Sequence, residues 1–228
     1  MDSLFNNFDN IIVFDFETTG FDPKKEEIIE IAALRVVNKK GVPVIEDGFD
    51  VLVKLTPNKH LPVIITNLTG ITEKMLVEKG VSKDEALIKL SDILSHSNSL
   101  LVAYNAQFDM CFLYNFLMRY QKALLLKSTM LLDVLTIYRD RRPYPHKLSD
   151  AVKAYSLNIM NSHRAGDDAK TTLDLLCKMG KETDDLDCYV NLFGYNPKYG
   201  VPRPKISSVK YLPQNYDVKK KLYEIDHS

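Results

Sequence analysis

The stretch that decides the fold is residues 10–17, Asn-Ile-Ile-Val-Phe-Asp-Phe-Glu. An unbroken apolar run followed by strict alternation predicts a buried β-strand. Because successive side chains of a strand point to opposite faces, Asp15 and Glu17 share one face, about 7 Å apart along the chain. Phe14 and Phe16 take the other face. The segment therefore presents two acids side by side at the end of a core strand.

Two carboxylates on a buried strand repel each other and are costly to desolvate. A divalent cation offsets that cost, so Asp15 and Glu17 are candidate metal ligands. The alternative is a solvated strand end that carries two unrelated acids. This segment alone does not distinguish the two.

The rest of the chain predicts an α/β layer fold with a mixed sheet. β-Branched and apolar residues predict strands over 28–37, 49–55 and 100–104, and the first two should form an antiparallel meander with 10–17. Ser82 and Glu85 form a capping box before a predicted helix. We expect helices over 82–96, 106–120, 131–138, 148–155 and 165–179.

Two further segments carry polar side chains next to element ends. Asn105 follows the predicted strand 100–104 as a helix N-cap, and Asp109 lies one turn further on. Ligands gather at such strand-to-helix corners in α/β sheets, although the helix dipole also favours an acid in a first turn. Near the last helix, His163 is able to take a proton from water and Asp168 lies in the first turns. The alternative is a surface histidine beside a capping turn.

The three segments together resemble one family. Their sequences are D-F-E-T-T-G at 15–20, N-A-x-F-D at 105–109 and H-R-A-x-x-D at 163–168. In this order and spacing they are similar to the DEDDh (DnaQ-like) 3′–5′ exonucleases, which have a ribonuclease H-like fold. The resemblance covers roughly residues 10 to 180. A histidine five residues before the last aspartate marks the DEDDh type rather than its tyrosine-bearing sibling group, and His163 stands five before Asp168.

The resemblance implies a two-metal-ion mechanism. Four carboxylates, Asp15, Glu17, Asp109 and Asp168, would hold two divalent cations, and hard oxygen ligands suit Mg²⁺ or Mn²⁺. Asp15 would bridge both ions. Two such ions can clamp a phosphodiester. His163 would be the general base on the attacking water, and nucleoside 5′-monophosphates would leave from the 3′ end.

The resemblance also implies substrate contacts. Thr18 and Thr19 stand where family members contact the terminal ribose and base. Phe21 is expected to wedge or stack against the last base, with a plain core contact as the alternative. Asn105 is expected to orient the turn that carries Asp109. Asp133 resembles a family position but is expected to be a helix cap.

A basic stretch precedes the histidine motif and is a candidate grip on backbone phosphates. A solvated basic loop is the alternative. Its members are Arg139, Arg141, Arg142 and Lys147.

Composition narrows the class of protein. The 228 residues are 45% apolar and 26% charged, which is typical of globular proteins. Thirty basic and thirty acidic residues cancel, which excludes a protein that recognises its main partner through a large net charge. Nucleic-acid binding stays possible, because a basic rim around an acidic centre also sums to zero. No apolar run approaches the roughly 18 residues of a membrane helix. The first ten residues lack secretory features, and three cysteines without a CxxC pair indicate reduced thiols. We expect a cytoplasmic protein with no membrane partner.

The chain is expected to divide into an exonuclease domain at 8–181 and a basic, Tyr- and Pro-rich C-terminal tail at 182–228. From Lys198 to Ser228 seven Lys/Arg residues stand against three Asp/Glu residues, a local charge of +4. We expect this tail to lie on the surface or to be partly disordered. If the protein binds a polymerase, we expect the binding surface to lie in this tail and to include Tyr195, Tyr199, Tyr211 and Tyr216.

The leading functional hypothesis is a metal-dependent exonuclease on single-stranded or frayed DNA ends, similar to the proofreading exonucleases of bacterial replicative polymerases. An exoribonuclease that trims RNA 3′ ends is the alternative within the same chemistry, because the motifs do not report on the 2′-hydroxyl. The alternative from another class is a non-catalytic module that binds a nucleic-acid end or a polymerase. Retention of all five motif residues argues against that module.

Overall fold

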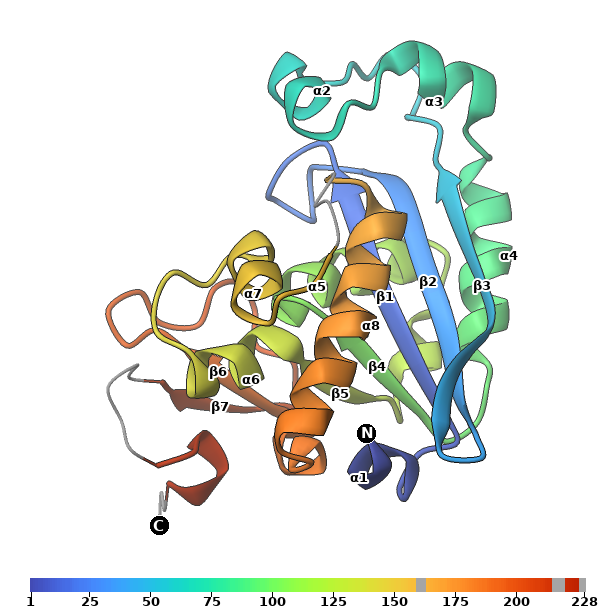
Figure 1. Ribbon diagram of the computed structural model, residues 1–228. Helices are drawn as coiled ribbons and strands as arrows, with labels where there is room; N and C mark the ends of the chain where they lie inside the picture. Colours follow the sequence, from blue (N-terminus) through green and yellow to red (C-terminus); the bar gives the residue numbers. More distant parts are fainter. Residues whose placement is uncertain (159–162, 215–219, 226–228) are drawn as a thin grey trace.

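The computed structural model describes residues 1–158, 163–214 and 220–225. Its centre is a mixed five-stranded sheet of order β3-β2-β1-β4-β5 (Figure 1). β1 (Asn10–Thr18), β2 (Ile28–Lys39) and β3 (Val42–Leu52) form the antiparallel meander, while β4 (Ser99–Ala103) and β5 (Met130–Asp133) run parallel to β1. The prediction of a mixed sheet that begins with a meander is therefore confirmed.

One helix prediction and one strand prediction need correction. The expected helix over 131–138 is wrong in its first part, because residues up to Asp133 form β5 and only then does α6 (Val134–Arg141) begin. A four-residue apolar run does not distinguish strand from helix by periodicity, and pairing with β4 decides the outcome. β3 also begins at Val42 rather than near 49, and its Pro43 is tolerated because β3 is an edge strand.

Helices cover both faces of the sheet. α4 (Lys83–Leu94) and α5 (Ala106–Arg119) pack with the β1 side chains that include Phe14 and Phe16. α6, α7 (Leu148–Ala154) and α8 (Ala165–Glu182) cover the other face, where Ile11 and Val13 point. Figure 1 shows α8 lying across β1 and β2. The two-residue period of β1 then directs the next side chains on that face, Asp15 and Glu17, toward α8.

Smaller elements complete the structure. α1 (Asp2–Phe5) precedes β1. α2 (Val63–Thr69) and α3 (Glu73–Lys79) pack beyond the end of the meander, on a small core that includes Ile29 and Leu52. η1 (Ala123–Leu126) follows α5. Among the described residues, none of the helices combines the length and apolar character needed to cross a membrane.

The segment after α8 differs from the expected surface tail. It forms η2 (Leu186–Tyr189), β6 (Leu192–Tyr195), β7 (Lys210–Pro213) and η3 (Leu222–Glu224). Tyr189 is fully buried, and Phe193, Leu212 and Leu222 join the two main cores. The apolar residues of this segment follow neither a strand nor a helix period, so the sequence does not predict that the segment packs on the core. Each of them still gains free energy when its apolar surface is removed from water. The boundary at 181/182 stays a prediction, and Tyr216 lies outside the described residues.

Candidate active site

Three of the four predicted acids meet at one point. Asp15 and Glu17 end β1, Asp168 lies in the first turn of α8, and one carboxylate oxygen from each lies within 4.8 Å of the others. The meeting follows from the packing of α8 across β1. Three oxygens this close form a ready set of hard ligands.

Asp109 stands beside this cluster in the first turn of α5 and is buried. Its Oδ1 accepts a hydrogen bond from the backbone N–H of Phe16, at 3.2 Å. This N–H is available because β4 pairs with β1 only as far as Val13. Asp109 is thereby held against the strand residue between Asp15 and Glu17.

Burial and mutual repulsion raise the pKa values of the carboxyl groups in this cluster. Burial, followed by the charges of Asp109, Asp168 and Glu17, raises the pKa of Asp15 well above its ordinary value. Burial and then the Asp168 charge raise the pKa of Glu17 to about 8. Burial also raises the pKa of Asp168 to about 6 and, despite the hydrogen bond from Phe16, that of Asp109. A bound cation would reverse these shifts, since an opposite charge favours the ionised form.

The residues present fit divalent cations. The Oδ1 atom of Asp168 is buried and has no hydrogen-bond partner among the described residues. A buried carboxylate oxygen without a donor is costly unless a ligand completes it. The donor set consists of carboxylate oxygens, which suit Mg²⁺ or Mn²⁺. The acidic cluster is therefore a fitting site for divalent metal.

His163 lies two residues before α8 begins. It is exposed, and its backbone φ of 48° is in the left-handed region. The neighbouring residues 159–162 lie outside the described part of the chain. The role of His163 as general base stays a prediction.

An ion pair between Glu30 and Arg164, which the sequence did not predict, supports the site. Glu30 of β2 is fully buried, although it stands opposite Glu17 in the sheet. Arg164 binds it through two nitrogens, with Nε 2.9 Å from Oε1 and 3.1 Å from Oε2. The N–H of Ala165 donates to Oε2 at 2.9 Å. A lone glutamate in an apolar strand was the available signal, because such a group is rarely buried without a partner.

Thr18 and Thr19 shape the loop after β1. Thr18 Oγ1 donates to the carbonyl of Gly20 at 2.7 Å, and Thr19 Oγ1 donates to Glu26 Oε2 at 2.6 Å. The Thr19 hydroxyl also accepts from the N–H of Glu27 at 2.9 Å. Both threonines are buried. Their hydroxyls thus serve the loop, and a contact of this segment with substrate stays a prediction.

Phe21 follows β1 in the chain and Asn105 directly precedes α5, the two elements that carry Asp15, Glu17 and Asp109. Phe21 is 80% exposed, so the alternative of a plain core contact is wrong. Asn105 occupies the N-cap position of α5, but its φ is 65° and its side chain makes no cap hydrogen bond. Its carbonyl instead accepts from the N–H of Phe108 at 2.9 Å. Asp133 caps α6 as expected, since its Oδ1 accepts from the Leu135 N–H at 3.3 Å.

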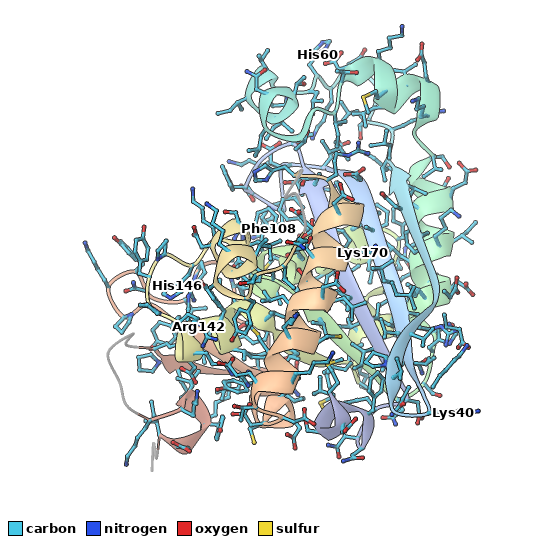
Figure 2. The ribbon with its side chains drawn as sticks, viewed as in Figure 1. Lys40, His60, Phe108, Arg142, His146 and Lys170 are labelled. Carbon is cyan, nitrogen blue, oxygen red and sulfur yellow. The ribbon has the colours of Figure 1, made fainter. Side chains whose placement is uncertain are left out.

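Arg141 and Arg142 of the basic stretch pair with acids of the protein, whereas Lys147 is exposed. Only 2% of the Arg141 side chain is exposed, and it pairs with Asp185. Arg142 stacks on the ring of Tyr155 at 4.5 Å and pairs with Glu182. Figure 2 labels Arg142 in this region, near His146. The expected phosphate grip is therefore wrong for Arg141, because a buried, paired guanidinium holds secondary elements together rather than facing solvent.

Comparisons with known proteins agree with this geometry. A family model described as "Exonuclease" matches residues 12–176. The PolC-type DNA polymerase III of Clostridium perfringens is 34% identical over 225 residues, covering 95% of this chain and 15% of that protein. The enzyme of Bacillus subtilis with the same name is 34% identical over 177 residues, covering 75% and 11%. The chain thus spans a small fraction of these relatives, and the first match includes most of the segment after Glu182.

Solved structures show the same fold. Escherichia coli exonuclease I in complex with a dT13 oligonucleotide aligns with a TM-score of 0.67 at 19% identity, covering 75% of this chain and 41% of that chain. Exonuclease I from Methylocaldum szegediense aligns with a TM-score of 0.64 at 19% identity, covering 78% and 42%. The expected ribonuclease H-like architecture is confirmed. With the exonuclease model spanning all three motifs, the chain belongs to the DEDDh-like 3′–5′ exonuclease family.

Proposed function

We propose that this chain is a metal-dependent exonuclease that removes nucleoside 5′-monophosphates from the 3′ end of single-stranded or frayed DNA, as in proofreading. The observation that carries this proposal is the meeting of the carboxylate oxygens of Asp15, Glu17 and Asp168 within 4.8 Å. Asp109 adds a fourth carboxylate beside them. Four acids that resist ionisation alone are suited to two divalent cations.

The chain's residues divide the work of hydrolysis. Asp15, Glu17, Asp109 and Asp168 would hold the cations. When bound, two divalent cations supply positive charge that stabilises the transition state at phosphorus and the leaving 3′ oxygen. His163 accepts a proton from the attacking water. The water oxygen bonds to phosphorus and the bond to the neighbouring 3′ oxygen breaks. That oxygen takes a proton from solvent, which leaves a 3′-hydroxyl on the shortened strand and a free nucleoside 5′-monophosphate.

DNA is the proposed substrate because of the relatives. The similar proteins are named as DNA polymerases, and the similar exonuclease I structure holds a DNA oligonucleotide. A polymerase is the proposed partner for the same reason. The carboxylates themselves do not distinguish DNA from RNA, since neither they nor the cations read a 2′-hydroxyl.

The test uses 5′-labelled single-stranded DNA and RNA of one sequence, with Mn²⁺, with Mg²⁺ and with EDTA. We expect a metal-dependent ladder that shortens from the 3′ end, faster on DNA than on RNA. Asp15→Ala should abolish it, while Glu78→Gln, an exposed acid on α3, should cleave like the wild type.

Each other outcome contradicts a defined part of the proposal. Faster cleavage of RNA would assign the chain to RNA trimming. Binding of both strands without cleavage under any metal would replace the enzyme by a binding module. Cleavage that persists in Asp15→Ala would place the active centre elsewhere.

A further inference from the structure

The segment after β6 returns to the catalytic half of the molecule. The buried side chain of Gln107, in the first turn of α5, donates from Nε2 to the carbonyl of Pro204 at 2.7 Å. Tyr211 OH donates to Gln107 Oε1 at 2.6 Å and accepts from the N–H of Ile206 at 2.9 Å. This chain of hydrogen bonds fixes residues 204–211 against the turn that carries Asp109.

Arg203 is thereby placed on two aromatic residues at the edge of the site. Its guanidinium carbon lies 4.5 Å from the ring centroid of Phe108, which directly precedes Asp109 and is labelled in Figure 2. Its Nη2 donates to the carbonyl of Phe21 at 3.0 Å. The rings of Phe21 and Phe108 meet edge to face at 6.5 Å. Arg203 therefore joins the loop after β1 to the start of α5.

The guanidinium keeps donors for a ligand. It offers five N–H groups, and the hydrogen bond to the carbonyl of Phe21 uses only Nη2. Positive charge continues next to it, because a cavity of about 540 Å³ between α5, η1 and residues 204–208 is lined by Lys24, Lys127 and Lys205. No carboxylate belongs to the described lining of this cavity. The cavity runs beside α5 residues that follow Asp109.

We propose that Arg203 binds a backbone phosphate of the substrate strand upstream of the bond that is cleaved. The inference rests on the proposed exonuclease function. Single strands are held by aromatic stacking combined with positive charge along the backbone. The exposed ring of Phe21 and the guanidinium of Arg203 place these two features side by side. The scissile phosphate belongs at the carboxylate cluster, so Arg203, at the solvent-exposed edge with Phe21, is placed for a phosphate further along the strand.

The test compares two substrates that differ in the upstream phosphate. An oligo-dT supplies it, whereas the p-nitrophenyl ester of thymidine 5′-monophosphate has only the scissile phosphate. For Arg203→Gln we expect the ratio of kcat/KM on the oligonucleotide to that on the ester to fall about tenfold or more, as for loss of one charged hydrogen bond. The loss should appear in KM, since uniform binding is removed. Arg203→Lys should recover part of it.

Lys198→Gln is the matched control, because Lys198 is an exposed cation of the same segment that stacks only on Tyr199 among the rings described. Equal kinetics of wild type and Arg203→Gln on both substrates would overturn the proposal. So would equal losses on both, which would mean that Arg203 supports the carboxylate cluster, or faster cleavage, which would mean that it occludes the strand.

Binding separates this inference from the proposed function. If the wild type cleaves neither substrate, the exonuclease proposal fails, and fluorescence anisotropy with labelled oligo-dT in Ca²⁺ still decides the role of Arg203. Each contacted phosphate of a single strand contributes about 0.7 to the slope of log affinity against log salt. Arg203→Gln and Arg203→Lys should therefore differ by about that slope, and an unchanged slope and affinity would overturn the phosphate contact.

Discussion

The carboxylate of Glu30 on β2 binds the guanidinium of Arg164 and accepts a hydrogen bond from the N–H of Ala165 at 2.9 Å. The sheet thereby holds the residue at which α8 begins, one turn before Asp168. The Glu30 charge also raises the pKa of Glu17 and Asp168, whereas the Arg164 charge lowers that of Glu17. The pair thus acts on both the position and the charge of the candidate metal ligands.

Glu30→Ala should destabilise the protein and slow cleavage together, because Arg164 loses its anchor and the start of α8 is released. Loss of one partner of a fully buried pair costs about 3–5 kcal/mol. Arg164 is 35% exposed and can be hydrated, so we expect a smaller loss. Urea unfolding and the cleavage rate measure it. Glu78→Gln, in the exposed pair with Lys74, is the control and should leave both unchanged. Retained stability in Glu30→Ala would contradict this account.

Asp109→Asn should keep the fold and lose activity. An asparagine oxygen can still accept a hydrogen bond from the Phe16 N–H, but the charge that would help hold a cation is gone. We expect cleavage to fall about 100-fold, the upper end of the range for losing a group around a metal. Asp109→Ala should in addition lower the free energy of unfolding by about 1–3 kcal/mol, because the Phe16 N–H loses its acceptor. Equal destabilisation of the two variants in urea would refute the role of this hydrogen bond.

Metal-free protein should lose stability as pH rises. The pKa of Glu17 is raised to about 8 and that of Asp168 to about 6, from ordinary values of 4.5 and 3.8. Between the ordinary and the raised values the native state binds more protons than the unfolded state, so stability present below about pH 4 is lost up to about pH 8. Urea midpoints in EDTA should therefore be lower at pH 8.5 than at pH 5.

Added Mn²⁺ should raise the midpoint much more at pH 8.5 than at pH 5, because it stabilises the ionised carboxylates. Glu17→Gln should flatten the pH dependence in EDTA. An EDTA-treated wild type with the same midpoint at both pH values would show that the acids do not repel one another in the native state.

Phe21→Ala should weaken substrate binding without unfolding the protein. Its ring is 80% exposed, and stacking of one base on an aromatic ring is worth about 1–3 kcal/mol. The dissociation constant for oligo-dT, measured by anisotropy, should rise by about 5- to 150-fold. Leu124→Ala, which is 79% exposed on η1, serves as the control. Similar affinities of the two variants would remove Phe21 from the substrate site.

His163→Ala should lower kcat on DNA by about 10²–10⁴-fold, the range of general base catalysis, and leave oligo-dT affinity unchanged. Single-turnover cleavage at pH 7 measures the chemical step. His60→Ala, an exposed histidine beside α2, is the control and should cleave like wild type. A rate loss of less than about threefold in His163→Ala would assign the proton transfer to another group.

The sequence determined those features that depend on local backbone geometry. The two-residue period of a strand placed Asp15 and Glu17 on one face and the phenylalanines between them on the other, and the structure has this arrangement. The capping box at Ser82 and the helix from Ala165 are equally local, and both are present. The three motifs indicated the family because each lies within a few consecutive residues.

Tertiary structure alone decided contacts between distant residues. The apolar residues 130–133 became a strand only because β4 offered a partner, and Arg141 turned inward because Asp185 lay behind it. Neither the Glu30–Arg164 pair nor the approach of Arg203 to Phe108 has a local pattern. Such contacts depend on packing free energy summed over many residues, whereas periodicity depends on the geometry of a few neighbouring peptide units.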